Sequence, residues 1–389
     1  MASIFSNQVP DFQILCSILS SKKTENQKSL LKQNFKKVDA DRLFQEAKND
    51  EITSHLIYAL EESGIEYNRE WKEDFIETEK RIVNLMNELE NVAIHLKEKD
   101  INVVGLKNAG ITKGIYINYA CSPMGDLDLL VSSKDFHKAH EIILNELGYT
   151  FKFRSEFERE DLEDAFKGGG TEYYKIVNGY KIWLELQWRP VAGRWIQPHN
   201  EPNGDELMKR SIPIEGSAVR LLAPEDNLLQ VCLHTAKHSY CRAPGFRLHT
   251  DVDRIVHYTI IDWKKFLNQA KTMKLKTAVY YSLLIPKELL YTPVPQEVIN
   301  TLKPNWIRRF IIEKLLTKAG LMNQHKKKFS KIGYILFNLS LYDSISEMST
   351  AIFPSSQVMK KRYDFNNSFL LPYFHIKRLT SLVLKRAKL

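Results

Sequence analysis

The chain has 389 residues, of which 43% are hydrophobic and 26% are charged, and its formal net charge at pH 7 is +9. This composition is typical of a globular protein of two or three domains with a large buried core, and no internal repeat or low-complexity tract appears. The positive charge favours anionic partners such as nucleotides, phosphorylated substrates or nucleic acid, but a lysine-rich genome explains it equally well.

The cysteine pattern and the N-terminus both point to an intracellular protein. The four cysteines are far apart and form no Cys-x-x-Cys pair: Cys16, Cys121, Cys232 and Cys241. This spacing argues against a disulfide framework or a zinc site and fits a reducing compartment. The N-terminus lacks a basic segment followed by an apolar run, and no apolar run is long enough to cross a membrane. We therefore expect a cytoplasmic protein without a transmembrane segment.

The first part of the chain, residues 10 to 95, is predicted to be helical. The longest helix is expected from about Glu70 to Lys99, and its apolar residues recur at helical spacing: Phe75, Ile82, Leu85, Leu89, Val92, Ala93 and Leu96. We interpret this apolar stripe as core packing rather than as a cofactor site. Residues 1–95 are thus expected to form an N-terminal helical region that packs on the next part of the chain.

A short strand and a helix are expected next. Residues 101–107 are mostly apolar and predict a strand, and small residues then open a helix at about Asn108. Lys107 lies where the strand gives way to the helix. A lysine beside a helix N-terminus is a favourable place for a phosphate group.

The segment Gly125-Asp126-Leu127-Asp128-Leu129-Leu130-Val131 carries the clearest chemical signal. Its alternation predicts a strand, so Asp126 and Asp128 share one face and lie about 7 Å apart along it. Two unpaired carboxylates this close repel each other, so a cation is expected beside them. Mg²⁺ is such a cation, because proteins hold it by one or two carboxylates while phosphates complete its shell. An edge strand with two solvated aspartates remains the alternative.

A helix and a hairpin follow. Residues 134–147 are predicted to be helical, and residues 149–153 to form a strand. Asn178-Gly179 then joins two strands, residues 172–177 and 180–188, and Asn-Gly is the strongest short hairpin signal. Glu185 interrupts the otherwise apolar second strand and needs a partner there, so it is a candidate third metal ligand.

This order of elements resembles the nucleotidyltransferase core of the DNA polymerase β superfamily. More narrowly, residues 75 to 290 are similar to a bacterial family of uncharacterised nucleotidyltransferases. The motifs that carry the resemblance are Leu106-Lys107-Asn108, Ser122-Pro123-Met124-Gly125-Asp126-Leu127-Asp128-Leu129-Leu130-Val131, Leu184-Glu185-Leu186-Gln187-Trp188, Leu222-Ala223-Pro224-Glu225-Asp226, Leu233-His234 with His238, and Arg247 with Asp251.

The resemblance implies an α+β fold: a polymerase β-like core with a mixed sheet, flanked by helical regions. The expected parts are an N-terminal helical region (1–95), the nucleotidyltransferase-like core (96–190), a C-terminal helical region (191–330) and a basic helical tail (331–389). The implied donor is a nucleoside triphosphate or a nucleotide sugar. The acceptor is open between a peptide, a sugar and a small molecule, and nucleic acid is a less favoured partner.

The resemblance also implies roles for residues of this chain. Asp126 and Asp128 would hold Mg²⁺ or Mn²⁺, and Glu185 would be a further ligand or the base. Contacts to the nucleotide or acceptor are expected from a larger set: Lys107, Asn108, Gly125, Arg154, His234, His238, Arg247 and Asp251.

Three positions depart from the family's pattern. Asn108 stands in place of a glycine, Ser122 in place of an arginine and Gln187 in place of a histidine. Losing the arginine removes a bidentate phosphate clamp. Asparagine tolerates a positive φ angle, so we expect Asn108 to preserve the turn and to donate to a phosphate.

Other segments carry weaker signals. Gly168-Gly169-Gly170 is interpreted as a flexible surface loop. His234 and His238 are expected at i and i+4 of a helix that begins at Pro224, with Asp251 or Asp253 paired to them or to Arg247.

Towards the C-terminus, helices are expected over residues 266–291 and 306–321, and a basic loop over 323–331. The last helix, about 374–389, is interpreted as docked, with a nucleic-acid or membrane tail as the alternative.

Three functional alternatives remain open at this point. The chain could be a catalytically silent nucleotide- or RNA-binding protein. It could transfer a glycosyl group from a nucleotide sugar. A hydrolase built on His234, His238 and Asp251 is the third.

Overall fold

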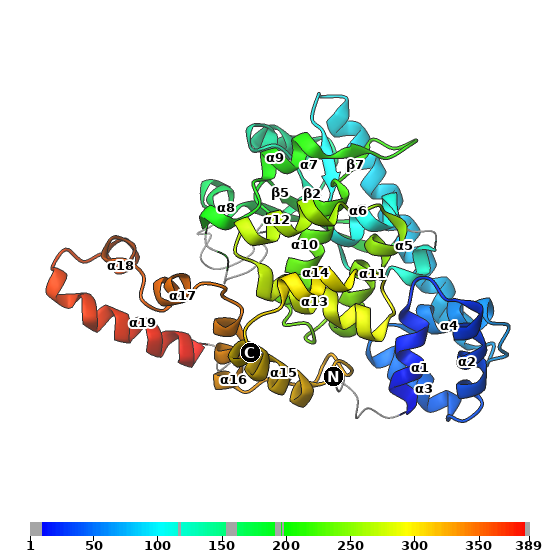
Figure 1. Ribbon diagram of the computed structural model, residues 1–389. Coiled ribbons are helices and arrows are strands. Elements are labelled where there is room, and N and C mark those ends of the chain that lie inside the picture. The colour runs from blue at the N-terminus through cyan, green and yellow to red at the C-terminus, as the bar shows by residue number, and fades with distance from the viewer. Residues whose placement is uncertain (1–9, 116–117, 153–161, 191–195, 197, 386–389) are drawn as a thin grey trace.

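The structure is a computed structural model that describes residues 10–115, 118–152, 162–190, 196 and 198–385. Arg154, a candidate substrate contact, lies outside the described residues. Figure 1 shows a sheet with its covering helices, a group of N-terminal helices at one side, and an arm of C-terminal helices that reaches away at the other. The expected class, a mixed sheet flanked by helical regions, is confirmed.

The N-terminal region is helical as expected. Its helices are α1 (Pro10–Leu19), α2 (Glu25–Phe35), α3 (Ala40–Asn49), α4 (Thr53–Glu62) and α5 (Trp71–Lys97). The starts of α2 and α3 are capped by side chains in the ordinary way. Thr24 and Gln27 form a reciprocal capping box at α2, and the carboxylate of Asp39 accepts a hydrogen bond from the backbone N–H of Arg42 at α3.

Seven strands form one mixed sheet in the order β3-β4-β5-β2-β1-β7-β6. They are β1 (Val103–Gly105), β2 (Asp126–Leu130), β3 (Thr150–Lys152), β4 (Gly170–Val177), β5 (Tyr180–Gln187), β6 (Ile212–Pro213) and β7 (Val219–Leu221). The central pair β2–β5 is parallel, and β4–β5 is the antiparallel hairpin predicted at Asn178-Gly179. Strands β6 and β7 were not predicted, because each is too short to show a periodic pattern.

The two faces of the sheet present different kinds of side chain. Leu127, Leu129, Leu184 and Leu186 are buried on one face with the apolar sides of α5 and α7 (Phe136–Asn145). Because side chains alternate along a strand, Asp126 and Asp128 point to the opposite face. The hydrophobic core therefore fixes which face presents the carboxylates, since a register slip by one residue would bury them.

Helix α6 (Lys107–Gly114) starts directly after β1 and packs unusually close to it. A Cβ atom on Gly110 would lie 2.2 Å from the carbonyl oxygen of Gly105. No side chain fits into this space, so the two glycines set how near the start of α6 comes to the sheet.

The triple glycine is not a surface loop. Helix α8 (Leu162–Gly168) ends at the first glycine, and β4 begins at the third. Gly169 has a φ of +96°, and its carbonyl oxygen accepts hydrogen bonds from the N–H groups of Trp188 and Arg189. The expected flexible loop is therefore wrong: the glycines make a tight turn between a helix and a strand.

Most of the remaining chain is helical. The helices are α9 (Gly204–Arg210), α10 (Pro224–Lys237), α11 (Leu248–Tyr258), α12 (Trp263–Thr272), α13 (Lys276–Leu289), α14 (Gln296–Leu302), α15 (Trp306–Ala319), α16 (Lys331–Ser340), α17 (Ile345–Ile352), α18 (Ser356–Tyr363) and α19 (Leu371–Lys385). Short 3-10 turns occur at Tyr119–Cys121, Ser133–Asp135, Pro198–Asn200, Gly245–Arg247 and Ser368–Leu370. The single helix expected over 266–291 is two helices, because Lys274 turns the chain with a φ of +55°.

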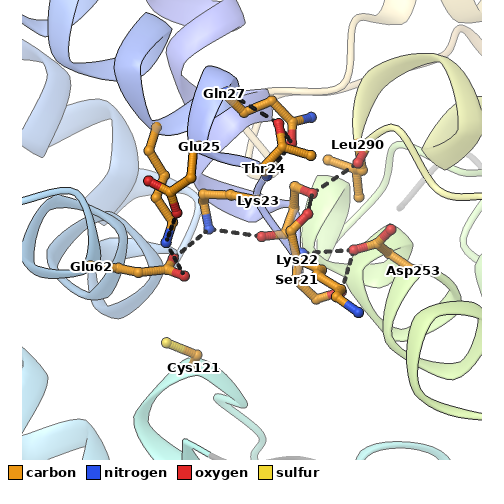
Figure 2. Close-up of polar contacts among 12 residues, drawn as sticks. Ser21, Lys22, Lys23, Thr24, Glu25, Gln27, Glu62, Cys121, Asp253 and Leu290 are labelled. Atoms are coloured by element: carbon orange, nitrogen blue, oxygen red, sulfur yellow. Dashed lines mark hydrogen bonds and ion pairs between the residues drawn. The ribbon is translucent and has the colours of Figure 1, made fainter.

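The N-terminal helices share a hydrophobic core with α10 to α16. Figure 2 shows the polar part of this contact, where the turn after α1 meets α11 and the end of α13. Ser21 donates from its backbone N–H and its hydroxyl to Asp253, at 2.8 and 2.5 Å. Lys23 donates to the carbonyl of Ser20 at 2.8 Å and pairs with Glu62 at 3.5 Å. The bonds of Ser21 tie the first helices to the C-terminal half of the chain, and those of Lys23 join the turn to the end of α4.

The last three helices form the arm in Figure 1. Helix α19 packs against α18, and Arg378 donates to the carbonyls of Ala351 and Ile352 at the end of α17. Within the described residues, no helix has both the length and the apolar character needed to cross a membrane. All four cysteines are free and buried.

Candidate functional site

Charged side chains form a row across the open face of the sheet. The strand register places Asp128 beside Glu185, Glu185 beside Glu172, and Glu172 beside Lys152. Residues paired in register share a face, so the row runs across β2, β5, β4 and β3. The sequence predicted the first two members of the row, whereas Glu172 and Lys152 were missed.

The structure brings the three predicted carboxylates together. Asp126, Asp128 and Glu185 each offer an oxygen, and these atoms lie within 4.8 Å of one another. Opposite ligand oxygens of an octahedral Mg²⁺ lie about 4 Å apart, so a modest side-chain adjustment would let one ion reach all three. Carboxylate oxygen is also the donor type that Mg²⁺ and Mn²⁺ prefer. We call these three residues the acidic triad.

The triad opens into a cavity of about 370 Å³. The cavity is lined by Gly125, Asp126, Lys152, Glu172, Trp183, Leu184 and Glu185. A Cβ on Gly125 would have no atom within 4 Å, so Gly125 leaves the entrance beside Asp126 open. The ammonium of Lys152 lies 4.6 Å from the centre of the Trp183 ring and adds positive charge to the far wall.

Asp128 is the anchored member of the triad. Lys107 Nζ donates to its Oδ1 at 2.7 Å, and Gln187 Nε2 donates to the same oxygen at 2.8 Å. Lys107 is therefore the cation that the paired aspartates required. Gln187, which stands where the family has a histidine, keeps a donor facing the carboxylate.

The turn at the start of α6 differs from the expectation. Lys107 has a φ of +50°, so the left-handed residue is the lysine and not Asn108, which begins the helical run. A non-glycine residue in this region costs about 1 kcal/mol or more. The cost is offset here by the ion pair with Asp128, which the turned backbone makes possible.

The two aspartates titrate in opposite directions. The side chain of Asp126 is exposed to the cavity, but partial loss of hydration and the charge of Asp128 raise the pKa of its carboxyl to about 6. Burial also opposes charge on Asp128, yet the ammonium of Lys107, a hydrogen bond with Glu185 and the nearby Lys237 hold its pKa below the usual value. Asp128 is thus firmly ionised at neutral pH, and Asp126 is close to its titration range.

The histidines lie beside this site on α10. His234 is in the last turn, and His238 caps the helix rather than continuing it. Their rings make an edge contact with centroids 4.8 Å apart, and His238 Nδ1 bonds the carbonyl of Ala243. Burial and the positive charge of nearby Lys107 and Lys237 lower the pKa of both, so both are neutral at pH 7. Lys237 was not predicted, and its position before His238 places a second cation near Asp128.

A second cluster lies on the other side of α6. With its amide nitrogen facing Asp251, Asn108 donates to Oδ1 at 2.9 Å and to Oδ2 at 2.5 Å. Asp251 also pairs with Arg254 at 3.4 Å, and Arg254 is 2% exposed. The guanidinium reaches His55 Nε2 at 3.0 Å, the hydroxyl of Ser122 at 3.5 Å and the carbonyl of Cys121. We call these groups the Arg254 cluster.

This cluster bears on several expectations. Asn108 faces Asp251 in this structure, and its contact to a phosphate stays a prediction. Asp251 forms its ion pair with Arg254 rather than with a histidine of α10. Arg247 forms its ion pair with Glu51 at 2.7 Å, and its charge also acts on Asp251. Among the described residues the acidic triad is also the only group of three acidic, histidine or cysteine side chains close enough to hold a metal, and it does not include His234, His238 or Asp251.

Asp253 and Ser122 are also engaged elsewhere. Asp253 accepts from Ser21 and Thr292 and lies 3.3 Å from His257, so it does not pair with His234, His238 or Arg247. Ser122 is buried, and its hydroxyl lies 2.5 Å from that of Thr112. Position 122 therefore faces the protein interior in this chain and offers no phosphate clamp.

Comparison with known proteins gives one informative result. A family model described as an uncharacterised nucleotidyltransferase matches residues 36–291. Curated proteins and solved structures give no match. The matched segment contains the whole sheet, the acidic triad and the Arg254 cluster. Because the match covers well over half of the chain, the protein belongs to this family of uncharacterised nucleotidyltransferases.

Proposed function

We propose that the protein is a metal-dependent enzyme that transfers a nucleotidyl group from a nucleoside triphosphate to an acceptor oxygen. In this reaction the acceptor attacks the α-phosphorus, the bond to the β-phosphate breaks, and pyrophosphate leaves. The observation that carries the proposal is the convergence of Asp126, Asp128 and Glu185, whose ligand atoms lie within 4.8 Å of one another at an open cavity. Family membership supports the reaction class.

The acidic triad would hold the ion, Mg²⁺ or Mn²⁺, which when bound would neutralise charge on the phosphates and activate the attacking oxygen. Lys107 would keep Asp128 ionised and oriented, because its ammonium donates to Oδ1 at 2.7 Å. Glu185, beside Asp128 in the strand register, would be a ligand or would receive the acceptor's proton. Lys152 and Trp183 form the far wall of the cavity, where the rest of the substrate would lie.

A nucleoside triphosphate is the donor that the site supports best, and a nucleotide sugar with glycosyl transfer is the alternative. The acceptor is proposed to be a peptide, a sugar or a small molecule. The cysteine pattern supports a cytoplasmic location, because all four thiols are free and buried.

One observation favours a second function. Lys107 already places a positive charge against the triad, so a catalytically silent protein could bind a nucleotide without a metal. Product formation separates the two functions.

The test is incubation with each labelled nucleoside triphosphate, Mg²⁺ and a cell extract, followed by detection of labelled product and pyrophosphate. We expect product with the wild type and a loss of at least about a hundredfold with Asp126→Asn or Asp128→Asn, because each change removes a charged metal ligand. Glu146→Gln, an exposed acid paired with Lys99, is the matched control and should retain full activity. Nucleotide binding without product would instead establish the silent binding protein, and product from a nucleotide sugar alone would establish glycosyl transfer.

A further inference from the structure

A second cavity lies away from the acidic triad, between the segment that follows α10 and the loop that joins α15 to α16. Its volume is about 360 Å³. It is lined by Arg242, Ala243, Gln324, His325, Lys326, Lys327, Lys328, Phe329, Ser330, Lys331 and Tyr334. The cavity shares no lining residue with the cavity at the triad. We call it the basic cavity.

The loop that forms the basic cavity is held in a fixed shape despite its charge. The backbone N–H groups of Asn323 and Gln324 both donate to the buried carboxylate of Asp50 at 2.8 Å. Lys328 turns inward, and its ammonium donates to the carbonyls of Gly320 and Met322 at 3.0 and 2.6 Å. The wall is therefore organised before any ligand arrives, which lowers the entropy cost of binding.

The positive charge of the basic cavity is not balanced by acidic residues in its wall. None of the described residues that line it is acidic. Lys326, Lys327 and Lys331 form no ion pair within the part of the chain that the structure describes, and the guanidinium of Arg242 lies over the ring of Tyr334, 5.1 Å from its centre. Like charges gathered around one space repel each other, and an anion in the cavity would relieve that repulsion.

The start of α16 adds to the positive potential in the basic cavity. Ser330 caps this helix by accepting from the N–H of Gly333 at 3.1 Å, and Lys331 is its first residue. The positive end of a ten-residue helix thus faces the space between the lysines.

We propose that the basic cavity is a second anion site, and that it takes the polyphosphate group of a small molecule. Several cations spaced along the wall match several phosphates better than one. The volume is at the lower end of the range for small-molecule pockets, which suits a triphosphate or a nucleotide rather than a length of nucleic acid. Phe329 and Tyr334 supply an apolar part of the wall beside the charges. The site is independent of the transfer reaction proposed above.

The test uses the full chain and inorganic tripolyphosphate, titrated by calorimetry in low salt with EDTA. EDTA removes the metal through which the acidic triad would bind phosphate, and the variants of Lys326 and Lys327 show whether the basic cavity is the site that binds. We expect one binding site in the wild type, and a loss of affinity of about tenfold or more in the double variant Lys326→Glu, Lys327→Glu. The matched control is Lys264→Glu with Lys271→Glu, two exposed lysines of α12 that make the same change in net charge. The control should bind as the wild type does.

Three outcomes would overturn the proposal. The first is no binding to the wild type at millimolar tripolyphosphate. The second is an equal loss of affinity in both double variants, which would indicate attraction to the net charge of the protein. The third is tighter binding of single-stranded RNA than of tripolyphosphate with no dependence on Lys326 and Lys327, which would indicate a nucleic-acid surface elsewhere. Thermal melts of all variants are the check that the substitutions at these exposed lysines leave the fold intact.

Discussion

The acidic triad and the Arg254 cluster lie on two sides of the first turn of α6 and differ in how their charges are balanced. Lys107 reaches Asp128 of the triad, and its neighbour Asn108 reaches Asp251 of the cluster. The Arg254 cluster is sealed, with Arg254 only 2% exposed and surrounded by acceptors. The triad carries three carboxylates against the one lysine bonded to Asp128 and opens to a cavity.

The difference shows how to separate a structural cluster from a functional one. A buried charge that is paired with an opposite charge helps to hold a fold together, and removing one partner leaves the other charge buried and uncompensated. An excess of one charge at a cavity is costly unless a ligand relieves it, so it marks a place where a ligand binds. Only the triad combines unbalanced charge with access from a cavity.

The largest expected effect is on stability, from Arg254→Ala. The change should lower the free energy of unfolding by about 3–5 kcal/mol, because it strands Asp251 and leaves a void among fully buried side chains. Urea unfolding followed by circular dichroism measures the loss. Lys209→Ala, which removes an exposed pair with Glu206, should change stability by less than about 0.5 kcal/mol. Similar losses in both variants would show that the Arg254 cluster is not structural.

Replacing one or the other aspartate of the triad should have different effects on the stability of the protein, although both aspartates are needed for transfer. In metal-free buffer, Asp128→Asn should lower the free energy of unfolding by about 2 kcal/mol, because Lys107, 14% exposed, loses its partner. Asp126→Asn should not destabilise, because it removes a carboxylate that its surroundings keep from ionising easily. Thermal melts with EDTA compare the variants. Equal shifts in both would contradict the assignment of Lys107 to Asp128.

Much of the triad was predictable because it depends on local pattern. The alternation in residues 126–130 places both aspartates on one face, and apolar Leu127 and Leu129 decide that this face is the open one. Glu172 was predictable too, but was missed. It lies six residues before Asn178, as Glu185 lies six after Gly179, so a symmetric hairpin pairs them directly.

The Arg254 cluster was not predictable, since its members come from four separate segments: His55, Asn108, Cys121-Ser122 and Asp251 with Arg254. Their meeting depends on how α4, α6 and α11 pack, and no local period encodes that. The same reason explains the wrong partners for Asp251 and Arg247. The sequence predicted a positive φ at Asn108, one position too late, because asparagine adopts a positive φ more readily than lysine does. In the structure the positive φ is at Lys107, where the ion pair with Asp128 stabilises it.

Lys107 connects backbone strain with function, and two substitutions separate these contributions. Lys107→Ala and Lys107→Gly both remove the ammonium, so both should weaken binding of Mg²⁺ with a non-hydrolysable nucleoside triphosphate by about tenfold. Only glycine accepts a φ of +50° freely, so Lys107→Gly should be more stable than Lys107→Ala by about 1 kcal/mol. Calorimetry and thermal melts measure the two effects. If Lys107→Ala binds as tightly as the wild type, the phosphates do not lie at this turn.

The smallest expected effect is the pH dependence of the stability difference between Asp126→Asn and the wild type, measured with EDTA. In the folded protein the pKa of the Asp126 carboxyl is raised to about 6, whereas in the unfolded chain it is about 4. Between these values the folded protein holds a proton that the unfolded chain has lost, so Asp126 makes the wild type less stable as the pH rises from about 4 to 6. The variant lacks this contribution. Its stability relative to the wild type should therefore increase across that window and level off above about pH 7. The increase should be below about 1 kcal/mol, because water screens an exposed carboxylate.

A difference that is constant from pH 4 to 8 would show that Asp126 titrates normally and that the triad does not disfavour its charge.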